Sequence, residues 1–83
     1  MKLNQQNLAN TFKGAREQGS SFVFVAIEAE GTKEVIAVPF KSFDAKEKFY
    51  ANAYTDELVH VMNSKVKIIG LTHGGTEALL DLA

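Results

Sequence analysis

The segment SFVFVAIEAEGTKEVIAVPF, residues 21–40, decides the fold of this 83-residue chain. It contains two runs of β-branched, aromatic and small apolar residues, Phe22–Ala29 and Val35–Phe40, joined by the link Glu30–Lys33. Two such runs around a short link that contains glycine are typical of a β-hairpin, because these side chains suit a pleated, half-buried surface. The rest of the fold is predicted outward from this hairpin.

The register of the hairpin is predicted from a turn centred on Gly31 and Thr32. One face of the hairpin then carries the pairs Val23 with Phe40, Val25 with Val38 and Ile27 with Ile36. That face is apolar throughout, as the core face of a sheet should be. With Ala29 and Glu34 as the last hydrogen-bonded pair, Pro39 is not required to donate an N–H to the first strand. A tighter two-residue turn would require that donor, so we expect the looser turn and an edge position for the second strand.

The composition predicts one globular domain spanning residues 1–83. The sequence has no cysteine, which excludes disulfides, thiolate nucleophiles and thiolate metal ligands. No apolar run approaches the roughly 20 residues that span a bilayer, and Met1–Asn7 lacks the hydrophobic region of a signal peptide. A net charge of -1 argues against nucleic acid and acidic membranes as partners. We expect a cytoplasmic protein without membrane contact.

The segment before the hairpin predicts a helix over Gln5–Gln18. Its apolar residues at helical spacing are Leu3, Leu8, Phe12 and Ala15. Asn4 is suited to cap the first turn, Leu3 can pack against Leu8 as a hydrophobic staple, and Gly19 ends the element. Gly14 in the interior should weaken the helix by up to about 1 kcal/mol.

A second helix is predicted from Ala45 to about Met62, with Asp44 and Glu47 as a capping box. Thr55 followed by two acidic residues could restart it, so the helix could be broken there. An alternative remains open for Leu58–Met62, which alternates like a strand and could turn back through the Asn63-Ser64 pair.

The segment Lys65–Leu71 predicts a third strand that pairs antiparallel with the first. The cross-strand pairs are Lys65 with Glu30, Lys67 with Glu28, Ile69 with Ala26, Leu71 with Phe24, Val66 with Ala29, Ile68 with Ile27 and Gly70 with Val25. This gives the order 2-1-3, with a right-handed helical crossover from strand two to strand three. A short helix capped by Thr76 and running to Ala83 completes a small α+β domain.

The second face of the predicted sheet is also apolar, and one helix cannot cover both faces. Its residues are Phe22, Phe24, Ala26, Ala37, Pro39, Ile69 and Leu71. Either another segment of the chain covers this face or a partner does. The candidate partner-binding residues are Phe24, Ala26, Pro39, Ile69 and Leu71.

The segment Thr72-His73-Gly74-Gly75-Thr76 is the candidate ligand site, because it follows a strand and opens a helix. Backbone N–H groups at its glycines could face an anion, and His73 could donate a hydrogen bond or act as a general acid or base. The loop lacks the lysine of a phosphate loop. His60 and His73 have no close metal-ligand spacing, so neither a metal nor another cofactor is expected.

These observations favour a non-catalytic protein–protein interaction module, acting as a homodimer, adaptor or inhibitor-type binder through the apolar sheet face or through the edge strand beside Pro39. No arrangement of serine, histidine and acid typical of catalysis is visible. One alternative is a small-molecule or anion binder, or a minor enzyme, that uses the His73-Gly74-Gly75 loop. A further alternative is weak nucleic-acid binding. Its candidate basic residues are Lys13, Arg16, Lys41, Lys46 and Lys48, with Phe49, Tyr50 and Tyr54 as stacking aromatics.

Overall fold

Strand β1 (Phe22–Ala29) is the centre of the sheet in a computed structural model, which describes residues 3–82. Strands β2 (Thr32–Pro39) and β3 (Val66–Gly74) flank it, and both run antiparallel to it. The strand order is β2-β1-β3, so the predicted order is confirmed and the two outer strands are both edges.

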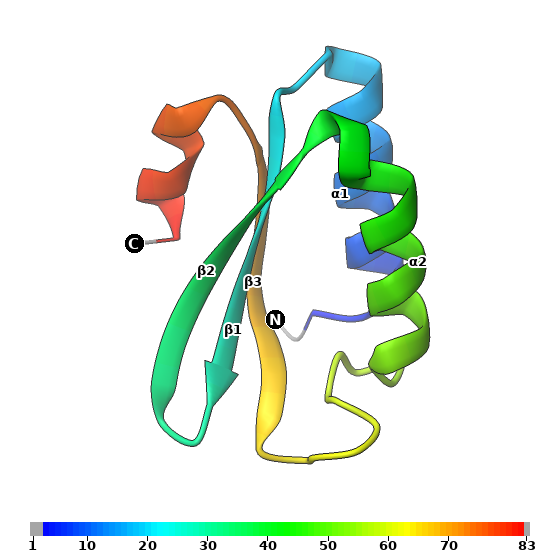
Figure 1. Cartoon of the computed structure of the whole chain (residues 1–83), viewed down its shortest axis with the longest axis vertical. Helices are drawn as coiled ribbons and strands as arrows, with labels where there is room; N and C mark the ends of the chain where they lie inside the picture. The colour runs from blue at the N-terminus through cyan, green and yellow to red at the C-terminus, as the bar shows by residue number, and fades with distance from the viewer. Residues whose placement is uncertain (1–2, 83) are drawn as a thin grey trace.

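Two helices cover one face of this sheet, and a short C-terminal turn of helix lies against the other (Figure 1). The two helices are α1 (Gln5–Gln18) and α2 (Phe43–Ala53), and the C-terminal element is the 3₁₀-helix η2 (Thr76–Asp81). A single 3₁₀ turn, η1 (Phe40–Ser42), links β2 to α2. The predicted α+β class is therefore confirmed. Within residues 3–82, no helix has the length and apolar character needed to cross a membrane.

The hairpin turn is tighter than predicted. Ala29 pairs with Thr32, and the two residues between them, Glu30 and Gly31, have φ values of 52° and 85°. Two consecutive positive φ values are the signature of a type I′ turn, whose twist matches that of the flanking strands. The register consequently differs from the predicted one by two residues, so that Val23 pairs with Val38. Because two is an even shift, every side chain keeps its predicted face.

The objection to a two-residue turn, that Pro39 would have to donate to β1, does not hold for this turn. The Phe40 N–H donates to the Ser21 carbonyl at 3.0 Å. Bonded and non-bonded pairs alternate in an antiparallel ladder, so the neighbouring pair of Phe22 with Pro39 is a non-bonded one. The missing N–H of Pro39 therefore costs no ladder bond.

Helix α1 begins and ends as predicted. The Asn4 side chain accepts from the Asn7 N–H at 3.0 Å, and the Asn7 side chain accepts from the Asn4 N–H at 2.9 Å. This reciprocal pair is a capping box that satisfies two backbone donors of the first turn. Gly19 ends the helix in the left-handed conformation, at φ 67°. The buried residues of α1 are Leu8, Phe12 and Ala15.

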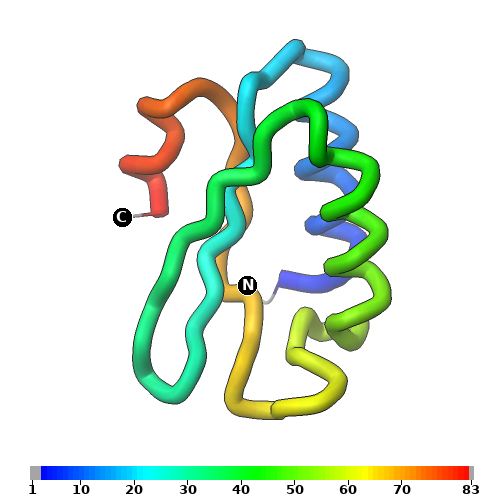
Figure 2. The backbone as a smooth tube through the Cα atoms, in the orientation of Figure 1, coloured from blue at the N-terminus to red at the C-terminus, as the bar shows by residue number. Residues whose placement is uncertain are grey.

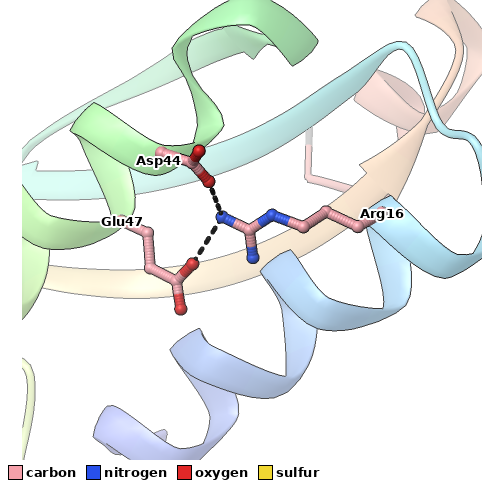
Figure 3. A network of polar contacts seen from close by, with 3 residues as sticks. All are labelled: Arg16, Asp44 and Glu47. Carbon is pink, nitrogen blue, oxygen red and sulfur yellow. Dashed lines mark hydrogen bonds and ion pairs between the residues drawn. The ribbon is translucent and has the colours of Figure 1, made fainter.

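Helix α2 begins at Phe43, and Asp44 and Glu47 do not form the predicted capping box. Their carboxylates instead each accept from the Arg16 guanidinium of α1 at 2.7 Å (Figure 3). The Glu47 hydrogen bond is the main cause that raises the Arg16 pKa above its usual value. The Asp44 side chain is almost fully exposed, so this tie between the helices should contribute less than about 1 kcal/mol.

The prediction that α2 continues to Met62 is wrong, because the helix ends at Ala53. Leu58 is fully buried and has a φ of 61°, which lies in the left-handed region and is incompatible with a right-handed α-helix. The following residues run along β3, where the His60 N–H donates to the Val66 carbonyl at 2.8 Å. The strand-like alternative is thus nearer to the structure, although only isolated bridges form there. Figure 2 shows this segment looping beneath α2 before it enters β3.

Strand β3 follows the predicted register only over its first half. Lys67 pairs with Glu28 and forms an ion pair with it at 3.7 Å, as predicted. A β-bulge at Ile69 then inserts one residue, so that Ala26 pairs with Gly70. Because a shift of one residue reverses the faces, Leu71 lies on the helix side, opposite to its predicted side.

The second sheet face is covered at its centre by the C-terminal segment of the same chain. Phe24 and Ala26 are only 3% and 1% exposed. A Cβ on Gly70 would lie 2.8 Å from the Leu82 side chain, so Leu82 packs directly over this glycine. The Lys33 ammonium also donates to the Leu82 carbonyl. The predicted C-terminal helix is a 3₁₀-helix that Thr76 does not cap, and its predicted end at Ala83 lies outside the described residues.

Burial of Tyr50 in the core predicts that the free energy of unfolding varies with pH. This side chain is almost fully buried, and burial, with Tyr54 nearby, raises the pKa of Tyr50 to about 12. The folded state therefore holds the phenol proton more tightly than the unfolded state, whose pKa is about 10. The resulting stability is fully present below pH 10 and is lost as the pH rises toward 12. In chemical denaturation across this range, Tyr50→Phe should lose less stability than wild type. Parallel curves for the two proteins would contradict the assignment.

Candidate functional site

The candidate site lies at the outer edge of β3, the side of this strand that does not pair with β1. Because β1 bonds to β2 through its odd-numbered residues, its even-numbered residues bond to β3. After the bulge, the partners of Phe24 and Phe22 are Thr72 and Gly74. The backbone groups of the residues between, Leu71 and His73, therefore point away from the sheet.

The first half of this edge is occupied by the chain itself. The Ile68 N–H donates to the Leu58 carbonyl at 2.9 Å, and the Val66 carbonyl accepts from His60. Beyond the bulge the edge is open: within residues 3–82, no backbone hydrogen bond from outside the ladder reaches Leu71 or His73. The outer edge of β3 is therefore hydrogen-bonded to the chain before Ile69 and open after it.

A groove of about 350 Å³ lies beside the open half of the edge, between β3 and α1. Its lining residues are Leu3, Asn7, Asn10, Thr11, Leu71, Thr72 and His73. The two leucines supply an apolar part, and amides and a hydroxyl of α1 supply a polar wall. None of these residues is a lysine, arginine, aspartate or glutamate.

The edge of β2 differs in its chemistry. Lys33 and Pro39 stand near the two ends of that strand, and Glu34 is exposed beside Lys33. Charged side chains and proline are the devices by which proteins stop an edge strand from pairing with another chain. The open half of β3, Ile69–Gly74, has neither. Of the two edges, it is the one that is chemically ready to accept a further strand.

His73 is held at the end of the groove by two contacts. Its Nδ1 lies 2.8 Å from the Ser20 hydroxyl, just after α1. Its Nε2 lies so close to Gly14 that a Cβ there would be 3.1 Å away. The absence of a side chain at Gly14 therefore leaves space beside α1 for the imidazole ring. This packing explains why a glycine lies inside the helix.

The predicted ligand loop is divided by the structure. Thr72, His73 and Gly74 belong to β3, and the first two line the groove. Gly75 and Thr76 lie outside the groove lining, at the start of η2. The Gly75 N–H donates to the Glu77 carboxylate at 3.3 Å, so the donor that an anion would need already faces an internal carboxylate.

The predicted partner-binding residues are also dispersed. Phe24 and Ala26 are covered by the C-terminal segment, whereas Pro39 lies on the other edge strand. Ile69 is partly exposed at the bulge, and Leu71 lines the groove. The structure therefore brings Leu71 together with Thr72 and His73, one member of the first predicted set with two members of the second.

The wall of the groove opposite β3 was not predicted; it is formed by Leu3, just before α1, and by Asn7, Asn10 and Thr11 of α1. The last three follow one another at helical spacing, which marks a polar stripe, but only the fold shows that the stripe faces the edge of β3.

The remaining candidate groups are engaged in local contacts. His60 packs edge-to-face on Tyr54, and its Nδ1 accepts from the Met62 N–H at 3.0 Å. Within the described part of the chain, no three histidine or acidic side chains gather as metal ligands would. Arg16, a member of the proposed basic patch, is paired with two carboxylates of α2.

In comparisons with known proteins, the chain matches no family model, no curated protein and no solved structure.

The contact between Gly14 and His73 predicts an interaction between two substitutions. Gly14→Ala should remove the helix penalty of glycine, worth about 1 kcal/mol, but its Cβ would press on the imidazole ring. We expect Gly14→Ala to lower the free energy of unfolding in wild type. In a His73→Ala background it should raise that free energy by up to about 1 kcal/mol. Urea denaturation of the four proteins measures the coupling, and equal effects in both backgrounds would refute the contact.

Proposed function

We propose that this protein is a non-catalytic protein–protein interaction module, and that it binds an extended, uncharged segment of its partner along the open half of β3. The observation that carries the proposal is the outward-facing backbone of Leu71 and His73 beside the groove of α1. An added strand would satisfy these backbone groups, and every second side chain of the segment would enter the groove.

The lining of the groove indicates the chemistry of the segment. A charged side chain entering the groove would lose water without meeting a permanently charged partner there, which is unfavourable. An apolar side chain beside Leu3 and Leu71 and a small polar one beside Asn7 and Thr11 would each find matching surface. We therefore expect a segment of alternating apolar and small polar residues without charge.

Within the interaction class, the edge of β3 has better support than the apolar face or the edge of β2 beside Pro39. Phe24 and Ala26 would become accessible only if the C-terminal segment left its place on the sheet. The edge requires no rearrangement of the described residues. A cytoplasmic location is kept as part of the proposal, and a fluorescent fusion expressed in its native cells would check it.

The experiment uses a displayed library of linear random peptides and the chain immobilised at a density too low for copies to meet. Selected peptides should be uncharged and rich in β-forming residues. Leu71→Pro removes one outward N–H without removing a ladder bond and should weaken binding of a selected peptide at least tenfold. Amide exchange at Leu71 and His73 should slow when the peptide is bound.

The matched control is Val35→Pro, which removes an outward N–H from the edge of β2. It should leave the affinity unchanged, and circular dichroism should show that both proline variants are folded. If Leu71→Pro binds a selected peptide as tightly as wild type does, or if the peptide protects the amides of β2 instead, the proposal fails.

A further inference from the structure

We infer that the segment which pairs with the open half of β3 is the same segment of a second copy of this chain. This inference rests on the proposed function, because it names the partner of that edge. It would make the protein a symmetric dimer with one continuous sheet.

Five residues of the open half, Gly70-Leu71-Thr72-His73-Gly74, have glycine at both ends and threonine in the middle. A two-fold axis beside Thr72 would align this segment antiparallel with its copy. Such an interface is isologous, since each copy would present the same patch.

The direction of the backbone groups fits this alignment. Leu71 and His73 both point outward, so Leu71 would form a bonded pair with His73 of the second copy, and His73 with its Leu71. The two reciprocal pairs supply roughly four backbone hydrogen bonds. Thr72 would face its own copy in a close, non-bonded pair, an arrangement in which threonine side chains interact favourably.

Charge and space favour the same occupant. The segment Ile69–Gly74 contains β-forming residues and no lysine, arginine, aspartate or glutamate, so two copies could pair through their backbones without bringing these charged side chains together at the edge. Gly70 would face Gly74 of the second copy, where strands approach closely and side chains would crowd. The new sheet would end in two β2 edges, each with Lys33 and Pro39, so that pairing would stop at two copies.

A charge exchange at Thr72 tests the inference. Wild type should have a solution mass of twice the 9.1 kDa chain, measured by sedimentation at micromolar to millimolar concentration. Thr72→Lys alone and Thr72→Glu alone should each be monomeric, because like charges would face each other across the axis. An equimolar mixture should recover the dimer, which would also show that both variants are folded.

The control pair is Val35→Lys and Val35→Glu, at the edge of β2 on the same sheet face; each should remain dimeric. A wild type that stays monomeric at millimolar concentration overturns the inference, and so do dimers that persist in both single Thr72 variants. A monomeric wild type whose peptide binding is lost in Leu71→Pro would refute only the second copy as partner. Peptide binding that is unaffected by Leu71→Pro would refute the proposed function itself.

Discussion

The structure depends on the burial of β1 on both of its faces. Four consecutive residues, Val23–Ala26, are each at most 3% exposed, although successive side chains point to opposite sides of the sheet. A short chain must therefore supply two covering layers for one central strand. The helices α1 and α2 form the first layer, and the C-terminal segment with Leu82 over Gly70 forms the second. Little chain remains to cover the edges.

The bulge at Ile69 determines the geometry of the candidate site. Without the inserted residue, Leu71 and His73 would share the face of Phe24, under the C-terminal segment. With it, Leu71 packs toward the core between the sheet and the helices, and His73 reaches Ser20 and Gly14. The same insertion turns the backbone of these two residues outward, where α1 forms the wall of the groove. One extra residue thus determines both the side-chain faces and the exposed hydrogen-bonding groups.

The parts of the fold that could be predicted are those set by local chemistry. Asn4 and Gly19 mark the ends of α1 through capping and a left-handed turn, and the ion pair of Lys67 with Glu28 marks the register of β3. The hairpin turn was predicted wrongly by two residues, since Glu30 in a left-handed conformation is uncommon for a residue other than glycine. The faces of the two hairpin strands are still predicted correctly, because an even shift preserves them.

The rest depended on packing between distant segments. A helical pattern extends past Ala53, but burial of Leu58 at a positive φ and its bond to Ile68 outweigh the local preference for helix. Gly70 is the one sequence signal of the bulge, since a glycine inside a strand often marks one. The predicted register nevertheless continues through Ile69 and places Leu71 on the wrong face. The groove could not be predicted from the sequence either, because α1 and β3 are far apart in the chain and meet only through tertiary packing.

The distribution of protection along the two edges is the strongest argument that the open half of β3 has a use. An unpaired strand edge invites aggregation, and this chain protects β2 with Lys33 and Pro39 and the start of β3 with the segment around Leu58 and His60. The remaining stretch could have been protected by a single lysine at Thr72, which is partly exposed. Leaving it uncharged costs solubility unless something pairs with it. The proposed strand addition would satisfy the backbone groups of this edge, while the charged and proline-containing edge of β2 would not pair further.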